Sequence, residues 1–449
     1  MAAITVTNWF GDVVSHPAVV VDAETADDLV KVMTQPTRYP SPVRAVGSNH
    51  STTPCGAIEG GTLVRMKMNR VLDISGDALR VEAGATYFDL AKELEQHGLQ
   101  FYVNTEIGGL SAGSAACAGT KDASFPGEFG HVGSYVTAMK LVLPTGELLE
   151  VTEAQPELMQ KARSSYGLFG IVYEVTFRVR PLLATAVHHE TFTLTDFVAR
   201  LPELKARNES MMFYFFPFKD LITIEFRRHN PNAHGQPNRH AWAIRNYLWS
   251  VTGPRLVRDA EANVHDPTVR NAMIESFNDI WRVQLETVVK SDHTVARDQI
   301  IHYPPTGSDS GYTFSLYAFA EDRFPQILSE FFRFTREHFQ RTGYRANLIY
   351  VGYAIAKDQH SLLSYSFDGP VITIDPVSTA NPGWDAYLDA YNEFCAARGG
   401  APLFNQSPRV TKAQFQQAYG ARLQTFAATR QTFDPGDRLL NDYFRTMLS

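Results

Sequence analysis

Cysteine is scarce in this sequence of 449 residues, and the three that occur, Cys55, Cys117 and Cys395, are widely separated. An odd, scattered set excludes a disulfide framework or a cysteine metal site and is typical of proteins from a reducing compartment. No apolar run approaches the roughly 20 residues of a membrane span. Residues 1–9 also lack the basic and apolar regions of a secretory leader. We therefore expect a cytoplasmic protein without a membrane span.

Positive charge is not in excess either. The chain has 41 Lys and Arg residues against 48 Asp and Glu residues, a net charge of −7, and contains no basic block. Nucleic acids and anionic membranes attract clustered positive charge, so neither is an expected partner. The hydrophobic share of 44% and the charged share of 20% are typical of a soluble globular protein. Because 449 residues exceed one ordinary core, we expect two domains.

The most informative segment is a short strand followed by a polar turn that ends in histidine. Residues 43–52 read VRAVGSNHST. Gly47 lets the backbone bend tightly, and the polar residues after it offer donors for phosphate oxygens. These residues alone leave two interpretations open: a phosphate-binding turn, or a solvated loop with an idle histidine.

Further motifs follow this turn in a definite order. Strand-like segments at 62–66, 72–74 and 78–84 precede a helical pattern over 88–97. The remaining motifs combine small residues with strand patterns and read GGLSAGSAACAGT at 108–120, GHVGSYV at 130–136, strands at 138–143 and 148–151, and GLFGIVYEVTFRVRP at 167–181.

This ordered series resembles the FAD-linked oxidases of the vanillyl-alcohol-oxidase type, which have a PCMH-type FAD-binding domain. The similarity is closest to the branch of alditol oxidase, the aldonolactone oxidases and the decaprenylphosphoryl-ribose oxidases, and it covers residues 15–182 and 384–449. It implies an α+β fold with a two-part FAD-binding domain and a separate mixed-sheet substrate domain. The implied limits are 1–182 for the PCMH-type FAD-binding domain, 183–400 for the substrate (cap) domain and 401–449 for a C-terminal segment that returns to the flavin.

The resemblance also implies which residues bind FAD, whose pyrophosphate suits the backbone amides of glycine-rich turns. No G-x-G-x-x-G motif follows the first strand, so a nicotinamide cofactor fits poorly. The implied FAD-binding residues are Arg44, Ala45, Val46, Gly47, Ser48, Asn49, His50 and Ser51 in the first loop, then Gly113, Ser114, Cys117, Ala118 and Thr120, then Gly133, Ser134 and Val136, then Ile171, and finally Asn441 and Tyr443 near the C-terminus.

His50 matches the histidine that relatives of alditol oxidase bond to the 8α-carbon of the flavin, so the resemblance implies a covalent FAD. An imidazole at that carbon withdraws electron density and commonly raises the flavin potential, which favours hydride uptake from an alcohol. The alternative is a histidine beside a non-covalent flavin. Cys117 follows the glycine pair that a second linkage would require it to precede, so we interpret it as a small packing residue.

The middle of the chain alternates strands with helices. Residues 211–217 and 221–227 are expected to form a hairpin. Strands are expected at 311–317, 346–353 and 369–375, helices at 323–340 and 387–398. Long helices between strands suggest a mixed sheet covered on one face, which in the family forms the roof over the flavin ring.

The catalytic residues of the family are not matched. The alditol and aldonolactone oxidases use a Glu-x-Arg pair on the roof strand and a lysine after the later Gly-Gly. Here the roof strand reads YVGYAIAK at 350–357, and Gln406 stands where the lysine is expected. Glu225 and Arg227 form a Glu-x-Arg on an earlier strand, which we interpret as a surface pair. The candidate catalytic residues are Tyr353, Gln406 and Lys357, with Tyr353 as the main polar contact to substrate.

The predicted function is FAD-dependent oxidation, by an oxidase or dehydrogenase, of a CH–OH or similar carbon centre, with hydride transfer to flavin N5. The expected partners are a small-molecule substrate and O2 or another electron acceptor, with no metal. Missing charged residues, together with Phe213, Phe215, Tyr317 and Phe404, suggest a substrate less polar than a sugar acid. Two alternatives stay open: a non-redox flavin-dependent transferase of the same fold, and a flavin-binding protein without turnover.

Overall fold

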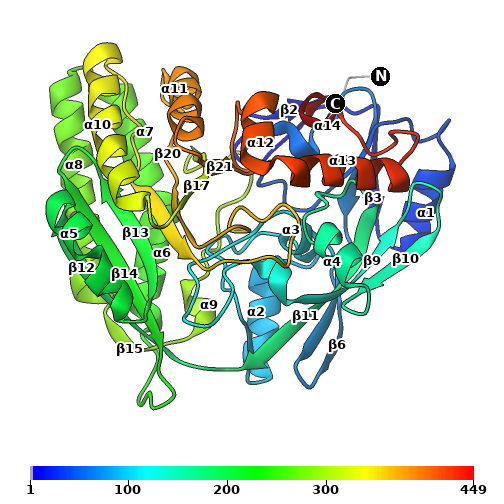
Figure 1. Cartoon of the computed structure of the whole chain (residues 1–449), viewed down its shortest axis with the longest axis horizontal. Helices are drawn as coiled ribbons and strands as arrows, with labels where there is room; N and C mark the ends of the chain where they lie inside the picture. The colour runs from blue at the N-terminus through cyan, green and yellow to red at the C-terminus, as the bar shows by residue number, and fades with distance from the viewer. Residues whose placement is uncertain (1–3, 449) are drawn as a thin grey trace.

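The computed structural model describes residues 4–448. The first three residues of the N-terminal stretch considered above lie outside this range. The chain forms two halves side by side, with the N-terminal residues in one half, the middle of the chain in the other, and the C-terminal helices back on the first (Figure 1). Within the described residues no helix is long and apolar enough to cross a membrane. The same range contains no group of three or more His, Cys, Asp or Glu residues arranged to hold a metal.

The first half contains a small parallel sheet and a larger antiparallel one. In the small sheet, β5 (Thr62–Met66) lies between β3 (Val19–Ala23) and β4 (Val43–Val46), and α1 (Ala26–Thr34) packs beside it. Thr25 and Asp28 form a capping box that begins α1, since each side chain accepts a backbone N–H of the other. A short antiparallel pair, β1 (Val6–Thr7) and β2 (Val14–Ser15), and the single turn η1 (Pro54–Gly56) complete this region.

The larger sheet of the first half has the strand order β10-β9-β11-β7-β6, with β8 added to β11. All its pairings are antiparallel. Its strands are β6 (Val71–Ser75), β7 (Ala78–Glu82), β8 (Leu99–Phe101), β9 (Val136–Val142), β10 (Leu148–Thr152) and β11 (Ile171–Pro181), and its helical segments are α2 (Tyr87–Gln96), α3 (Ala112–Cys117), η2 (Val132–Tyr135) and α4 (Pro156–Ala162).

The second half is built on an eight-stranded sheet of order β15-β12-β14-β13-β18-β19-β17-β21. The α+β class is confirmed, but every pairing in this sheet is antiparallel, so the expectation of a mixed sheet here was wrong. The strands are β12 (Thr185–Thr193), β13 (Ser210–Phe216), β14 (Leu221–His229), β15 (Ser291–Thr294), β17 (Tyr317–Ala320), β18 (Tyr350–Ile355), β19 (Val371–Ile374) and β21 (Ala401–Pro402), with a separate pair β16 (Thr313–Phe314) and β20 (Val377–Ser378).

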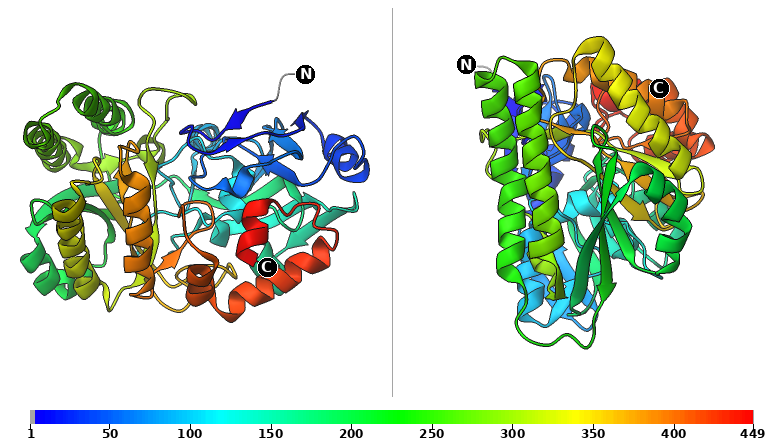
Figure 2. Two further views of the ribbon diagram at one scale, coloured as in Figure 1. Left: turned by 90° about the horizontal axis from the view of Figure 1, so that it is seen from above. Right: turned by 90° about the vertical axis from the view of Figure 1, so that its left-hand side faces the viewer.

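Helices cover this sheet on both faces rather than on one. Phe213 of β13 packs edge-on against Phe197, whereas the next residue, Tyr214, packs against Trp281 on the opposite face. Figure 2 shows α7 and α8 on one side of the sheet and α10 on the other. The double cover explains why every residue of β13 is buried. The helical segments are α5 (Leu194–Ala206), α6 (Arg239–Tyr247), η3 (Leu248–Thr252), α7 (Gly253–Asn263), α8 (Pro267–Gln284), η4 (Leu285–Val289), α9 (Ala296–Gln299), α10 (Phe324–Thr342) and α11 (Trp384–Ala396).

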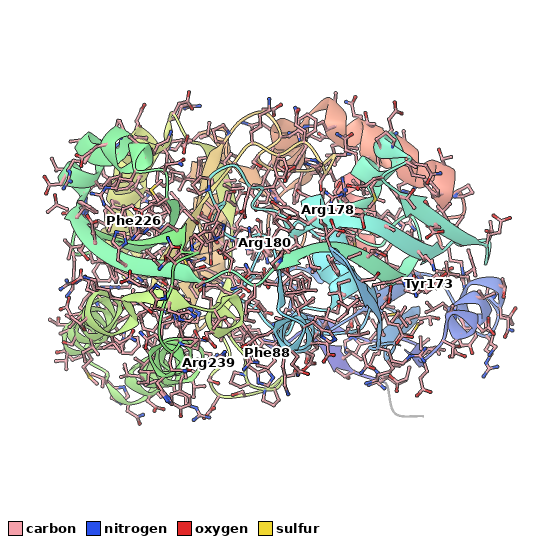
Figure 3. All side chains as sticks on the ribbon, turned by 90° about the horizontal axis from the view of Figure 1, so that it is seen from below. Phe88, Tyr173, Arg178, Arg180, Phe226 and Arg239 are labelled. Carbon is pink, nitrogen blue, oxygen red and sulfur yellow. The ribbon has the colours of Figure 1, made fainter. Side chains whose placement is uncertain are left out.

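The two halves are joined where β11 passes into β12. Figure 3 shows Arg180 at this crossing, with Tyr173 farther into the first half and Phe226 in the second. An ion pair of Arg180 with Glu128, 2.5 Å between Nη1 and Oε1, is extended by His229, whose Nε2 lies 2.9 Å from the same oxygen. The helices α12 (Lys412–Tyr419), α13 (Ala421–Phe433) and α14 (Asp442–Leu448) then return the chain to the first half.

Candidate functional site

The turn after β4 is pressed against the start of α3. A Cβ built on Gly47 would lie 2.0 Å from Oγ of Ser111, so no larger residue fits without moving one of the two segments. Asn49 has a φ of 54°, a left-handed conformation that asparagine tolerates better than most residues. Its side-chain amide donates to the carbonyl of Thr7 at 3.0 Å, which fixes the turn from the other side.

The backbone amides of this turn are free to bind an anion. Among residues 4–448, no N–H group of residues 47–51 donates to another protein group. The Ser48 hydroxyl donates to the carbonyl of Gly109, so it braces the turn. Unpaired amides that line a cleft need a partner, and phosphate oxygens suit them. The donor set therefore fits the pyrophosphate of FAD.

The turn opens into a large cleft with an empty volume of about 1070 Å³, part of it open to solvent. Segments from several separate parts of the chain meet there. Fourteen of the residues expected to bind FAD line it: Arg44, Ala45, Val46, Gly47, Ser48, Asn49, His50, Ser51, Gly113, Ser114, Cys117, Ala118, Thr120 and Ile171. Residues not anticipated from the sequence also line it, among them Cys55, Met66, Ala83, Tyr166, Val172 and Asn405.

The other five expected FAD-binding residues do not line this cleft. Gly133, Ser134 and Val136 lie beside it at η2 and β9, where Oγ of Ser134 donates to Asp358. The Asn441 amide donates to the carbonyls of Pro54 and Ala57 at 3.0 and 2.9 Å, and thereby holds η1. The Tyr443 hydroxyl donates to the carbonyl of Phe404 at 2.7 Å. In this structure Ser134, Asn441 and Tyr443 therefore bond to other protein groups, and none of the five lines the cleft.

His50 lies at the end of the turn in an apolar environment. Its ring stacks on Trp9 with 5.0 Å between centroids, and a Cβ on Gly109 would lie 3.0 Å from its Nε2. Burial lowers the pKa of His50 to about 4. The imidazole is therefore neutral at physiological pH, with a nitrogen lone pair available for bonding. Cys117 differs, because burial raises the pKa of its thiol to about 11 and keeps it protonated.

A second cavity of about 590 Å³ adjoins the cleft. The two share four lining residues, Ile107, Leu110, Thr120 and Gln406, so they lie side by side. Tyr353 lines the second cavity, as expected for the roof strand. Lys357 is exposed and lines neither space. The second cavity has an aromatic wall of Trp249, Tyr303, Tyr312 and Phe314 and a polar end of Glu106, Lys121, Tyr353 and Asp375.

Hydrogen bonds and ion pairs join the side chains at the polar end of the second cavity. The Tyr353 hydroxyl donates to Oε2 of Glu106 at 2.5 Å, and Glu106 also pairs with Arg245. Lys121 lies 3.2 Å from the Asp375 carboxylate, with its ammonium 3.5 Å from the ring centroid of Tyr353. Burial raises the pKa of Asp375 to about 6, although Lys121 lowers it. This end of the cavity can hold a hydroxyl group and move its proton.

Behind this cavity lies a buried ion network that includes the Glu-x-Arg pair. The interpretation of Glu225 and Arg227 as a surface pair was wrong, because their exposed fractions are 0% and 1%. Arg227 binds Glu225 at 2.5 Å and Asp122 at 2.8 Å, and Glu225 also binds His189 at 2.9 Å. The face of the sheet that carries Glu225 is covered, because Tyr214, which donates to Glu225, packs against Trp281 of α8.

Glu106, Lys121 and Asp375 were not anticipated from the sequence. Glu106 stands just before the Gly108–Gly109 pair and Lys121 just after the small-residue segment, so both charges flank motifs already recognised. A charge beside a cofactor-binding segment was the available signal. Their convergence with Asp375 depends on pairings more than 240 residues apart, which no local pattern reveals.

Comparison with known proteins gives this geometry a context. Residues 17–152 match the family described as "FAD binding domain". The chain is 24% identical to L-gulono-1,4-lactone dehydrogenase of Mycobacterium tuberculosis over 98% of each chain. It is 25% identical to L-gulonolactone oxidase of Mus musculus over 56% of this chain and 59% of that one. Among solved structures, cholesterol oxidase from B. sterolicum has the same fold, with a TM-score of 0.78 at 14% identity over 99% and 96% of the two chains.

Proposed function

We propose that this protein oxidises a ring CH–OH group of an aldono-1,4-lactone or a similar small cyclic compound. Its PCMH-type FAD-binding domain and its full-length similarity to FAD-linked dehydrogenases and oxidases make it an FAD-dependent oxidoreductase. The relatives named for L-gulono-1,4-lactone suggest the substrate class. Such a lactone has hydroxyl groups but no carboxylate, which suits a cavity with one aromatic wall and one polar end.

The observation that carries this proposal is that the second cavity adjoins the cleft, with four lining residues in common. A cofactor in the cleft can present one end to a substrate in the cavity beside Thr120 and Gln406. When bound, the flavin accepts a hydride. The chain's own groups would do the rest: the amides of residues 47–51 hold the phosphates, and the polar end of the cavity orients the hydroxyl.

We further place the domain limits at residues 182 and 400. The first half supplies the turn and α3, the second supplies Tyr353, and the segment after 400 supplies Asn405 and Gln406.

Product analysis tests the function directly. Aerobic incubation with L-gulono-1,4-lactone should give a product that has lost two hydrogens. An unchanged mass for every hydroxy compound in a panel of lactones, polyols and cyclic alcohols would contradict the proposal.

FAD is proposed to be covalent through His50. Its neutral imidazole lines the cleft, and Trp9 restricts how the ring can turn. The bond replaces one methyl C–H and the imidazole N–H, so two protons leave and two electrons pass to the flavin ring, from which oxygen takes them.

Acid precipitation tests the linkage. The yellow colour should stay with the washed wild-type polypeptide, because a covalent flavin cannot dissociate on unfolding. The His50→Ala variant should release its flavin to the supernatant. Flavin found entirely in the wild-type supernatant would contradict the linkage and leave FAD binding intact.

The pH dependence of attachment follows from the depressed pKa of His50. With a pKa of about 4, the neutral fraction hardly changes between pH 7.5 and pH 5, so the rate at which apo protein fixes FAD should stay nearly constant. An imidazole with the ordinary pKa of about 6.5 would lose about 30-fold of its neutral form over the same range. The measurement is flavin fluorescence in denaturing gels over time, and a drop of 10-fold or more by pH 5 would contradict this account.

A further inference from the structure

We propose that Glu106 is the proton acceptor of the reaction, working through the hydroxyl of Tyr353, and that Arg245 is the positioning residue that holds Glu106. The inference deepens the proposed function and rests on it. Glu106 and Tyr353 both line the second cavity, and one hydrogen bond joins them. No other tyrosine of this cavity donates to a carboxylate within the described part of the chain.

The hydrogen bond to Glu106 fixes the orientation of the Tyr353 hydroxyl group. Its hydroxyl donates to Oε2 of Glu106 at 2.5 Å, so its oxygen keeps lone pairs that can accept a proton from a substrate. Burial raises the pKa of Tyr353 well above its ordinary value, so the phenol stays protonated at neutral pH. A protonated phenol can relay a proton to a carboxylate but cannot by itself act as a base.

Arg245 fixes the carboxylate from behind. Its side chain is 1% exposed and lies near the rings of Trp242 and Trp281, with its guanidinium carbon 5.6 and 5.8 Å from their centroids. It pairs with Oε1 of Glu106 and donates to the Tyr214 hydroxyl at 2.8 Å. Because Oε1 is taken by the arginine, Oε2 is left for Tyr353.

The charged and titratable groups around Glu106 and Tyr353 come from several helices and strands. Arg245 of α6 and Tyr214 of β13 lie behind it. Lys121 lies over the Tyr353 ring and pairs with Asp375, and Tyr303 and Tyr312 share a hydrogen bond of 2.5 Å across the cavity. The nearest part of the buried network is Asp122, Glu225 and Arg227.

Asp375 is the rival acceptor. Its Oδ1 has no hydrogen-bond partner among the described residues, and it lines the same cavity. Its other oxygen, however, is bound to Lys121, and no hydroxyl of the cavity joins it to a substrate position. We assign Asp375 to holding Lys121 and Glu106 to taking the proton.

The substrate O–H bond breaks and its proton passes to the Tyr353 oxygen, while the phenolic proton passes to Glu106. The carbinol C–H bond breaks and its hydrogen leaves with two electrons to the flavin, so a C=O bond forms. Glu106 later returns the proton to water, and oxygen or another acceptor takes the two electrons.

Rapid anaerobic mixing tests the assignment, with L-gulono-1,4-lactone, xylitol and cyclohexanol as probes. Tyr353→Phe and Glu106→Gln should each lower the rate of flavin reduction by roughly 10²- to 10⁴-fold. The double variant should be little slower than the slower single one, because both residues serve one relay. Flavin content should be unchanged.

Two further variants separate this role from a structural one. Glu128→Gln is the matched control: Glu128 pairs with Arg180 and is 17% exposed, against 12% for Glu106, and it lines neither space. It should keep the wild-type rate. Tyr353→Phe leaves the Glu106–Arg245 pair intact, so it reports on the relay even if Glu106→Gln fails to fold.

Three results would overturn the assignment. One is a wild-type rate of flavin reduction in Tyr353→Phe. Another is a rate that Asp375→Asn lowers and Glu106→Gln keeps. The third is a loss in the double variant equal to the product of the single losses. If none of the probes reduces the wild-type flavin, the result would instead contradict the proposed function, and with it the assignment of Glu106 as proton acceptor.

Discussion

Replacing Gly47 by valine should yield protein that is purified almost without flavin. A Cβ at this position would lie 2.0 Å from Oγ and 2.5 Å from Cβ of Ser111, so the turn must move away from α3. That movement would disperse the unpaired amides of residues 47–51, which are the proposed phosphate donors. The measurement is the ratio of the absorbance near 450 nm to the absorbance at 280 nm. This ratio should be roughly tenfold lower in Gly47→Val than in wild type.

The control is Gly369→Val. A Cβ on Gly369 would meet no atom within 4 Å, and its φ is not in the left-handed region. This variant should keep full flavin content. Gly47→Val purified with full flavin would show that the turn does not hold the cofactor.

Replacing Arg227 by methionine should destabilise the protein by about 3–5 kcal/mol, because it leaves two buried carboxylates without their shared cation. Arg227 is 1% exposed and pairs with both Glu225 and Asp122. Burial opposes ionisation of Glu225, yet Arg227 and His189 together hold its pKa well below the ordinary value. Burial also raises the pKa of Asp122 to about 6, even with Arg227 beside it.

Urea unfolding at pH 7.5 is the measurement for Arg227→Met. The comparison is Arg65→Met, whose partner Asp22 and own side chain are 43% and 50% exposed. Breaking this surface pair should cost less than about 1 kcal/mol. A loss of the same small size in Arg227→Met would contradict the view that the buried network supports the cap.

Much of the fold could be predicted from local patterns. The hairpin expected at 211–217 and 221–227 is observed as β13 and β14, and the helix expected at 323–340 as α10. Two helices were found within a few residues of their expected ends, α2 and α11. The strand expected at 311–317 is instead two short strands, β16 and β17, because the chain leaves one pairing for another between Phe314 and Tyr317.

The helices over 239–289 were not anticipated. The stretch contains two π-helical turns, η3 and η4, which interrupt the helical spacing of apolar residues. These helices cover the second face of the cap sheet, bring Trp249 to the cavity and place Arg245 behind Glu106. The Glu-x-Arg pair, expected at the surface, is buried in the same half of the molecule.

The FAD cleft could be predicted better than the substrate cavity, for a physical reason. The amides and small residues that hold a dinucleotide come from continuous segments, 44–51 and 113–120, whose order is visible in the sequence. The cavity is made by single side chains from distant strands and loops. Tyr353 could be placed from the roof strand, whereas its partner Glu106 lies 247 residues earlier and Lys357 proved to face solvent.

The central claim is that a hydroxy compound in the second cavity reduces a flavin held in the cleft. Anaerobic titration of the purified protein with L-gulono-1,4-lactone and related cyclic alcohols measures this directly. The account predicts that at least one of them bleaches the flavin absorbance near 450 nm, and that air restores it. A flavin that stays oxidised with every compound, yet is bleached by dithionite, would contradict the claim.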